Sequence, residues 1–309
     1  MGLLITFIII VLIVTIIIGA ITWRLSNIIL KPKVLSTNEI YDKEVLKGRL
    51  DEEFYNSIKK EEFILTSRYG YKLSGIILSN EETNKSVNLH KVAVLCHGYT
   101  YGKYGSVCYA KILMELGFTC VIYDHRNHGD SDKVYTSMGY YEKYDLQTVI
   151  DFCYEHFGED IKVITHGESM GAATVLNHLE IDNRVTCTIA DCPFSDLTSL
   201  LQYQLKRYYH LPAALFLPIA NLIFKIRAGF FIKDVSPMNS VTNTKTPVLF
   251  IHGEDDMYVP ASMSIEMYEK RSEAKDIFIC EGAKHAQSCI IDPLKYFQSI
   301  IKFLDKYYA

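Results

Sequence analysis

The sequence predicts an α/β protein in which a mostly parallel sheet of eight strands is flanked by helices. From residue 91 onward, short apolar runs of strand type alternate with amphipathic helical patterns. Such alternation is typical of a parallel sheet with helices on both faces. One of these strand runs, Lys162–Thr165, leads into Gly167-Glu168-Ser169-Met170-Gly171 and then into a helical pattern, which is the context of a nucleophilic serine.

The chain begins with an apolar run, Leu3–Thr22, that contains no charged side chain. About 20 apolar residues are enough for a helix to cross a bilayer. Trp23 follows at the expected interfacial position, and the next basic residues are Arg24, Lys31 and Lys33. A cleaved signal peptide is the alternative, but no basic region precedes the run and no Ala-x-Ala site closes it. We therefore expect a single-pass anchor over residues 1–25 in the cell membrane, with the catalytic domain in the cytoplasm.

Residues 26–61 are polar and mixed in charge, and Pro32 interrupts their start. We expect them to be a linker with a helical patch near Lys43–Lys60. The folded domain is then expected over residues 62–309.

The domain should open with a hairpin and continue with parallel strands separated by helices. The expected strands are Glu62–Ser67, Tyr71–Leu78, Val92–Cys96, Thr119–Tyr123, Lys162–Thr165, Val185–Ala190, Pro247–Ile251 and Asp276–Cys280. The expected helices are Ser106–Leu116, Tyr140–His156, Met170–Leu179 and an amphipathic helix at the C-terminus. A polar loop, Asn80–Asn88, follows the hairpin.

The alternation is interrupted between Asp191 and Pro247 by a stretch that favours helix over strand. Its middle, Leu211–Ile232, is apolar and aromatic, but prolines and charged residues disfavour a second membrane span. We expect a lid of short helices over about residues 193–245 that presents an apolar face to an acyl or aromatic substrate.

The loops at the C-terminal ends of parallel strands carry the candidate catalytic residues. Ser169 would lie at a helix N-terminus, where backbone N–H groups favour negative charge. Gly167 and Gly171 are expected because a Cβ at either position would collide with the backbone of the tight turn. His285 would take the proton of Ser169 as general base, and Asp256 would orient the imidazole ring.

The acidic member of this triad has two alternatives. Asp255 is adjacent to Asp256 in the same loop, and Asp191 ends an earlier strand from which a histidine is within reach.

The loop after the first parallel strand begins with His97-Gly98-Tyr99. Gly98 would let the backbone turn sharply, so that the N–H groups of Tyr99 and Met170 converge as an oxyanion hole. The next loop, Asp124–Ser131, contains two histidines. A hydrogen-bonded polar loop explains them as well as a metal site does, and no metal or other cofactor is expected.

Composition excludes other classes of protein. The formal net charge is −4 and no basic stripe occurs, which argues against nucleic acid as a partner. The 8 cysteines are spread along the chain without a Cys-x-x-Cys pair, and buried free thiols are expected.

From about Phe63 to the C-terminus, the chain resembles the α/β-hydrolase superfamily. The motifs that carry the resemblance are His97-Gly98, Asp124-His125-Arg126-x-His128-Gly129-x-Ser131, Gly167-Glu168-Ser169-Met170-Gly171 and His252-Gly253-x-x-Asp256-x-x-Val259-Pro260. They are similar to those of the serine-aminopeptidase and monoacylglycerol-lipase-like branch, in particular its bacterial members with a membrane anchor. The Asp-x-x-Val-Pro spacing singles out Asp256, and the chain order of serine, acid and histidine is that of the superfamily. Asn127 departs from the usual Arg-Gly-His-Gly.

The sequence therefore predicts a membrane-anchored serine hydrolase that cleaves carboxylic esters, with acylglycerols and other lipids as candidate substrates. One alternative is a serine aminopeptidase acting on short peptides. It would need an acidic or carbonyl-rich pocket for the substrate ammonium, and the apolar lid gives little sign of one. A catalytically silent membrane scaffold is another alternative, and the intact Ser169, Asp256 and His285 argue against it.

Overall fold

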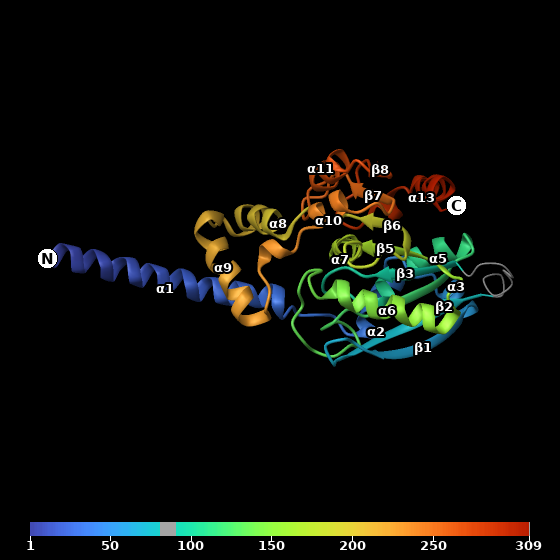
Figure 1. Ribbon diagram of the computed structural model, residues 1–309, viewed down its shortest axis with the longest axis horizontal. Helices are drawn as coiled ribbons and strands as arrows, with labels where there is room; N and C mark the ends of the chain where they lie inside the picture. The colour runs from blue at the N-terminus through green and yellow to red at the C-terminus, as the bar shows by residue number, and fades with distance from the viewer. Residues whose placement is uncertain (81–90, 309) are drawn as a thin grey trace.

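The computed structural model describes residues 1–80 and 91–308. Figure 1 shows a folded domain built around a sheet, and a long N-terminal helix projects from this domain. The sheet has 8 strands in the order β1-β2-β4-β3-β5-β6-β7-β8. They are β1 (Lys59–Thr66), β2 (Lys72–Ser79), β3 (Lys91–Cys96), β4 (Thr119–Tyr123), β5 (Lys162–Glu168), β6 (Val185–Asp191), β7 (Val248–Gly253) and β8 (Lys275–Cys280). β2 pairs antiparallel with β1 and β4, and every other pair of neighbours is parallel. The predicted sheet is confirmed, while the loop expected after the hairpin lies outside the described residues from residue 81 onward.

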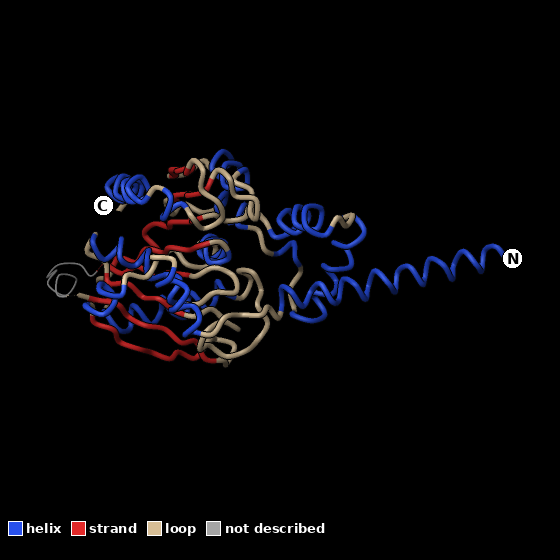
Figure 2. The backbone as a smooth tube through the Cα atoms, turned by 180° about the vertical axis from the view of Figure 1, so that it is seen from behind, coloured by secondary structure: helices blue, strands red, loops and turns tan. Residues whose placement is uncertain are grey.

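Helices cover both faces of the sheet, as the view from behind in Figure 2 also shows. One face is covered by α2 (Thr37–Leu46), α3 (Glu52–Ser57), α5 (Val107–Glu115), α12 (Ser288–Ile291) and α13 (Pro293–Tyr307). The other face is covered by α6 (Glu142–Phe157), α7 (Met170–His178), α10 (Pro237–Asn243) and α11 (Ser262–Lys270). Successive strand residues point to opposite faces, so Val94 and Leu95 of β3 belong to different core clusters.

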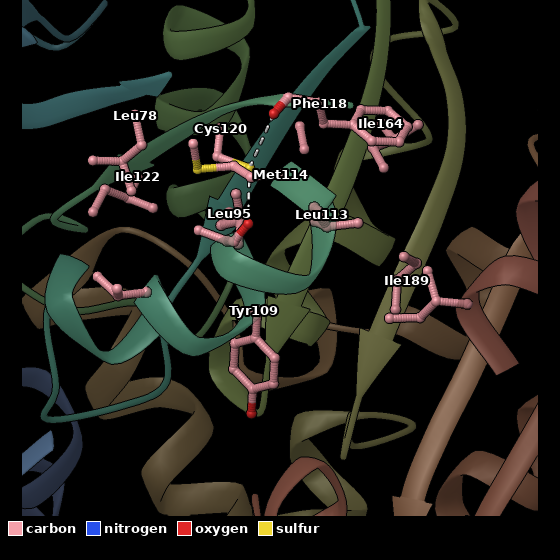
Figure 3. Close-up of a cluster of buried hydrophobic side chains, with 14 of the residues drawn as sticks. Leu78, Leu95, Tyr109, Leu113, Met114, Phe118, Cys120, Ile122, Ile164 and Ile189 are labelled. Atoms are coloured by element: carbon pink, nitrogen blue, oxygen red, sulfur yellow. Dashed lines mark hydrogen bonds between the residues drawn. The ribbon is translucent and has the colours of Figure 1, made fainter. Parts of the chain in front are cut away.

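Figure 3 shows the core cluster between α5 and the central strands. Leu113 of α5 packs into the same cluster as Leu95, Ile122 and Ile164, and each of these side chains is almost completely buried. Burial of one such side chain contributes roughly 1.5–3 kcal/mol. This packing fixes the positions of the central strands. The loops at the C-terminal ends of these strands contain candidate catalytic residues. All 8 cysteines are free thiols, and most are buried, as predicted.

Residues 26–61 are not the linker that the sequence predicts. The N-terminal helix α1 (Gly2–Leu30) continues beyond residue 25, and the side chain of Leu30 is fully buried. In place of one helical patch, α2 and α3 pack on the sheet, with Ile40, Leu50 and Tyr55 buried. A few apolar residues at helical spacing are enough to bury one face of a segment whose overall composition is polar.

The insertion between β6 and β7 is helical, as predicted. It contains α8 (Leu197–Gln204), a short π-helical turn (Leu205–Tyr209), α9 (Ala213–Ala228), a 3₁₀ turn (Ile232–Asp234) and α10. Among the described residues, α1 alone is by itself long and apolar enough to cross a membrane, a property that signal sequences share. α9 meets the same criterion only together with the following segment, to which it is bent by 80°.

Candidate active site

The turn between β5 and α7 forms the tight elbow that the sequence predicts. Ser169 has φ 57° and ψ −112°, a conformation that costs energy for any residue with a Cβ. A Cβ at Gly167 would lie 2.3 Å from the carbonyl oxygen of Gly171. One at Gly171 would lie 2.0 Å from the carbonyl oxygen of Cys96. Only glycine fits at these two positions, and the elbow presents the Ser169 hydroxyl at the start of α7.

His285 and Asp256 lie next to this hydroxyl. Nε2 of His285 is 2.9 Å from Oγ of Ser169, and Nδ1 of the same ring is 2.6 Å from Oδ2 of Asp256. The three side chains come from the loops that follow β5, β7 and β8. The structure thus brings the predicted serine, histidine and acid into one hydrogen-bonded chain. In this chain the imidazole can accept the serine proton while its other nitrogen donates to the carboxylate.

Backbone and side-chain donors fix the Asp256 carboxylate. Its Oδ1 accepts hydrogen bonds from the N–H groups of Tyr258 (2.8 Å) and Val259 (2.9 Å), and its Oδ2 is 3.2 Å from Nε2 of His252. This arrangement explains the Asp-x-x-Val-Pro spacing, because the loop must turn back onto the carboxylate. Burial opposes ionisation of Asp256, but the hydrogen bonds from His252 and His285 outweigh it and hold its pKa below the ordinary value.

The two alternative acids lie elsewhere. Asp255 is exposed, and its N–H donates to the carbonyl of Ala283. Asp191 is fully buried at the end of β6, where its Oδ2 accepts a hydrogen bond from the Tyr296 hydroxyl at 3.1 Å. Burial, together with the nearby carboxylate of Glu168, raises the pKa of Asp191 to about 7. The carboxylate bonded to the His285 ring is that of Asp256.

The loop after β3 passes directly beside the elbow. A Cβ at Gly98 would lie 3.0 Å from Oε1 of Glu168 and 3.7 Å from Cβ of Ser169. A side chain at Gly98 would thus crowd the Glu168 carboxylate, and the positive φ of the loop falls on Thr100 and not on Gly98. In the described part of the chain, the N–H of Tyr99 has no hydrogen-bond acceptor. The N–H of Met170, in the first turn of α7, lacks an intrahelical one.

Two buried histidine rings and the backbone N–H of His125 hold this loop in place. His97 donates to the carbonyl of Gly98 through Nδ1 (2.7 Å) and accepts the N–H of His125 at Nε2 (2.9 Å). Nε2 of His128 accepts the N–H of Thr100 at 3.2 Å. Burial lowers the pKa of His128 to about 4, so its ring is neutral and able to accept.

Arg49 is a site residue that the sequence prediction missed. Its side chain is 7% exposed, and its Nη2 is 2.7 Å from Oε2 of Glu168. Nη1 donates to the carbonyl of Ala286 at 3.3 Å, and Nε is 2.9 Å from a carboxylate oxygen of Glu44. The Tyr109 hydroxyl donates to the same Glu168 oxygen at 2.6 Å. The N-terminal segment therefore braces both the elbow and the residue that follows His285.

Cys192, Asp256 and His285 bring ligand-type atoms within 4.8 Å of one another. These residues do not fit a metal site. The His285 ring is already engaged by the serine and the carboxylate.

Two cavities meet at Ser169. The apolar cavity, of about 290 Å³, is lined by Ile28, Ile29, Tyr99, Met138, Ser169, Phe194, Leu200, Leu201, Gln204, Tyr208, Tyr209, Tyr258 and Val259. The polar cavity, of about 470 Å³, is lined by Lys47, Arg49, Gly98, Tyr99, Thr100, Tyr101, Glu168, Ser169, Tyr258, His285, Ala286, Gln287 and Ile290. A substrate with one apolar and one polar part would have its central bond at the serine.

The fold and the serine–histidine–aspartate geometry are those of an α/β hydrolase. The family profile described as "Serine aminopeptidase, S33" matches residues 88–225. The chain is 34% identical over 282 residues to the uncharacterized Bacillus subtilis protein YqkD, covering 91% of this chain and 90% of that protein. This chain belongs to the α/β hydrolases of the serine aminopeptidase S33 family.

Solved structures agree on the fold. The Pyrococcus furiosus esterase Pf2001 has a TM-score of 0.68 at 20% identity, over 91% of this chain and 98% of that one. The Pyrococcus horikoshii acylaminoacyl peptidase has a TM-score of 0.62 at 16% identity, over 86% of this chain but 43% of that one. At these sequence identities the similarity to the solved structures shows the fold alone. The assignment of the chain as a hydrolase rests on its family.

Proposed function

We propose that this protein is a membrane-anchored serine hydrolase that cleaves carboxylic esters through an acyl-enzyme. The observation that carries the proposal is the hydrogen-bonded chain from Ser169 through His285 to Asp256 at the junction of two cavities. His285 removes the proton of Ser169 as Oγ bonds to the ester carbonyl carbon. The N–H groups of Tyr99 and Met170 stabilise the resulting oxyanion.

Collapse of the tetrahedral intermediate breaks the bond to the alcohol oxygen, and His285 returns the proton to the departing alcohol. Water then attacks the acyl carbon while His285 takes a proton from it. Collapse of this second intermediate breaks the bond to Oγ of Ser169, His285 returns the proton to Oγ, and the carboxylic acid leaves. Asp256 remains ionised throughout and stabilises the imidazolium, in agreement with the direction of its pKa shift.

The polar cavity supports an ester rather than a peptide with a free N-terminus as substrate. An aminopeptidase must hold a substrate ammonium, which requires an available carboxylate or a cluster of carbonyl groups. Among the described residues, Glu168 is the carboxylate that lines the cavities, and Arg49 and Tyr109 already bind it. Lys47 adds a second cation to the same wall. Glu44 and Glu168 are thus already paired with Lys47 and Arg49, so neither carboxylate is available to bind an ammonium group.

A retained single-pass anchor at the cell membrane is part of the proposal. The basic residues Arg24, Lys31 and Lys33 follow the apolar run, so the positive-inside rule favours a cytoplasmic domain. Contacts of the last turns of α1 with the domain support retention: Leu30 is completely buried and Thr22 is nearly so. Cleavage at the end of the apolar run would remove the packed Thr22 side chain and the part of the helix that leads into Leu30.

A fluorophosphonate probe and a panel of chromogenic substrates test the proposal. The wild type should be labelled by the probe and should hydrolyse p-nitrophenyl esters far faster than aminoacyl p-nitroanilides. Ser169→Ala should lose both properties, with a fall in rate on the order of 10⁴–10⁶. Preference for the anilides would identify an aminopeptidase, and absence of labelling would identify a silent scaffold.

A further inference from the structure

The last turns of α1 are part of the folded domain. Thr22, Ser26 and Leu30 are spaced by four residues and are 3%, 2% and 0% exposed, so one face of the helix is covered. In contrast, the apolar residues from Leu3 to Ile17 are largely exposed. The boundary between the exposed and the packed part of α1 therefore lies near Thr22, and in Figure 1 α9 runs beside the packed part.

An arginine of the lid holds this part of α1. Arg227 of α9 donates to the carbonyl of Trp23 at 3.2 Å, to Oδ1 of Asn27 at 2.6 Å and to the Ser26 hydroxyl. Its guanidinium group also lies 4.5 Å from the centre of the Trp23 ring. The position of the lid is thus tied to the membrane-proximal end of α1.

The same turns of α1 form a wall of the apolar cavity at Ser169. Ile28 and Ile29 line this cavity opposite Leu201 of α8. A second, smaller cavity of about 50 Å³ lies between α1 and the lid, and Ile29 and Leu201 line it as well. The Tyr99 hydroxyl donates to the carbonyl of Ile28, which fixes α1 to the loop beside the nucleophile. The two cavities therefore adjoin at Ile29 and Leu201, and together they form an apolar track along α1 between Ser169 and Thr22.

The lid offers a second apolar surface beside α1. Leu215, Leu222 and Ile226 of α9 are 54%, 57% and 68% exposed, and their spacing of seven and four residues places them on one side of the helix. An exposed apolar stripe next to a membrane-spanning helix is suited to rest on the bilayer. The track would then open at the surface of the membrane and not into water.

We propose that α1 is a structural wall of the acyl site and that the substrate is a long-chain lipid ester, whose acyl chain passes from the bilayer along α1 to Ser169. This inference rests on the proposed esterase function and adds the substrate class. An acyl chain that moves along this route stays in apolar surroundings, so the large cost of exposing its methylenes to water does not arise.

Full-length protein in nanodiscs tests the inference, with p-nitrophenyl acetate and p-nitrophenyl dodecanoate as substrates. Ile29→Trp places a large ring where the two cavities meet and should lower the dodecanoate-to-acetate ratio of kcat/KM at least tenfold. Ile29→Ala removes part of the wall and should lower the same ratio severalfold. The matched control is Ile17→Trp on the exposed part of α1, which should leave the ratio unchanged.

The outcomes separate the two proposals. If all three proteins hydrolyse acetate and the dodecanoate-to-acetate ratio of kcat/KM is the same in wild type, Ile29→Trp and Ile29→Ala, the proposed role of α1 is overturned. Equal effects of Ile17→Trp and Ile29→Trp would overturn it too, because a general disturbance of the anchor would then be responsible. Failure of the wild type to hydrolyse either ester would instead reject the esterase function itself.

Discussion

Replacement of Arg49 by methionine is expected to destabilise the protein and to slow hydrolysis, although the guanidinium group makes no hydrogen bond to Ser169 or His285. The side chain is buried between the carboxylates of Glu44 and Glu168 and also bonds the carbonyl next to His285. Methionine has a flexible apolar side chain that can fill much of the space without the charge. Both buried carboxylates would then lose their strongest partner.

The magnitude follows from these contacts. Removal of one partner from a buried ion pair costs about 3–5 kcal/mol. For a large domain, each kcal/mol lowers Tm by roughly 2–4 °C, so a fall on the order of 10 °C is expected. Release of the Ala286 carbonyl should also let the His285 loop move, and a displacement of about 1 Å can cost on the order of 10²-fold in rate. We expect kcat to fall by about tenfold to a hundredfold.

The loss of stability should depend on pH. Burial opposes ionisation of Glu168, but in the wild type Arg49 outweighs it and keeps the pKa of Glu168 below its ordinary value. A lowered folded-state pKa stabilises the protein above the unfolded-state pKa, and that contribution is lost as pH falls through the folded-state pKa. Without Arg49, burial raises the pKa instead, and protonation in mild acid relieves the penalty. The difference in Tm should therefore shrink between about pH 7.5 and about pH 5.

Thermal melts at these two pH values and the kcat for p-nitrophenyl acetate measure the effect. Lys47→Met is the matched control, because this neighbouring cation is 48% exposed and surface ion pairs contribute about 0–1 kcal/mol. Arg49→Met combined with Glu168→Gln should recover part of the lost stability. The reasoning is refuted if Arg49→Met melts like Lys47→Met, or if its deficit in Tm is the same at both pH values.

Three further predictions follow from the site and the anchor. Asp256→Asn should lower kcat by about 10⁴, whereas Asp255→Asn and Asp191→Asn should remain far more active; if either of these is the most damaging in a steady-state assay, the acid is assigned wrongly. Gly171→Ala should yield little folded protein, because its Cβ would lie 2.0 Å from a carbonyl oxygen of β3, and near-normal expression and melting would contradict the elbow geometry. The apolar run Leu3–Thr22 should keep the protein in the membrane fraction through carbonate washing, and a mature N-terminus beyond it would identify a cleaved signal.

The local features of this protein can be predicted from its amino-acid sequence. The strand Thr119–Tyr123 has the bounds that its apolar run predicts, because a fully buried strand needs an apolar side chain on both faces. The elbow was recognisable from its Gly-x-Ser-x-Gly pattern between a strand and a helix, and Gly167 is required by a contact with Gly171 in the same turn. Gly171, in contrast, is required by the carbonyl of Cys96 on β3, a contact that local sequence does not show. The apolar run at the N-terminus needs no partner to be identified, since its length and composition define its preference for a bilayer.

The distant residues that support the site can be identified from the three-dimensional fold but not from the sequence. The contact between Arg49 and Glu168 joins positions 119 residues apart, and nothing in the polar composition of residues 26–61 marks that arginine. Likewise, hydropathy identifies α1 as apolar but says nothing of Ile29 lining a cavity at Ser169. Periodicity and composition indicate how many side chains of a segment are apolar and favour burial. Which surface then covers it depends on the path of the whole chain.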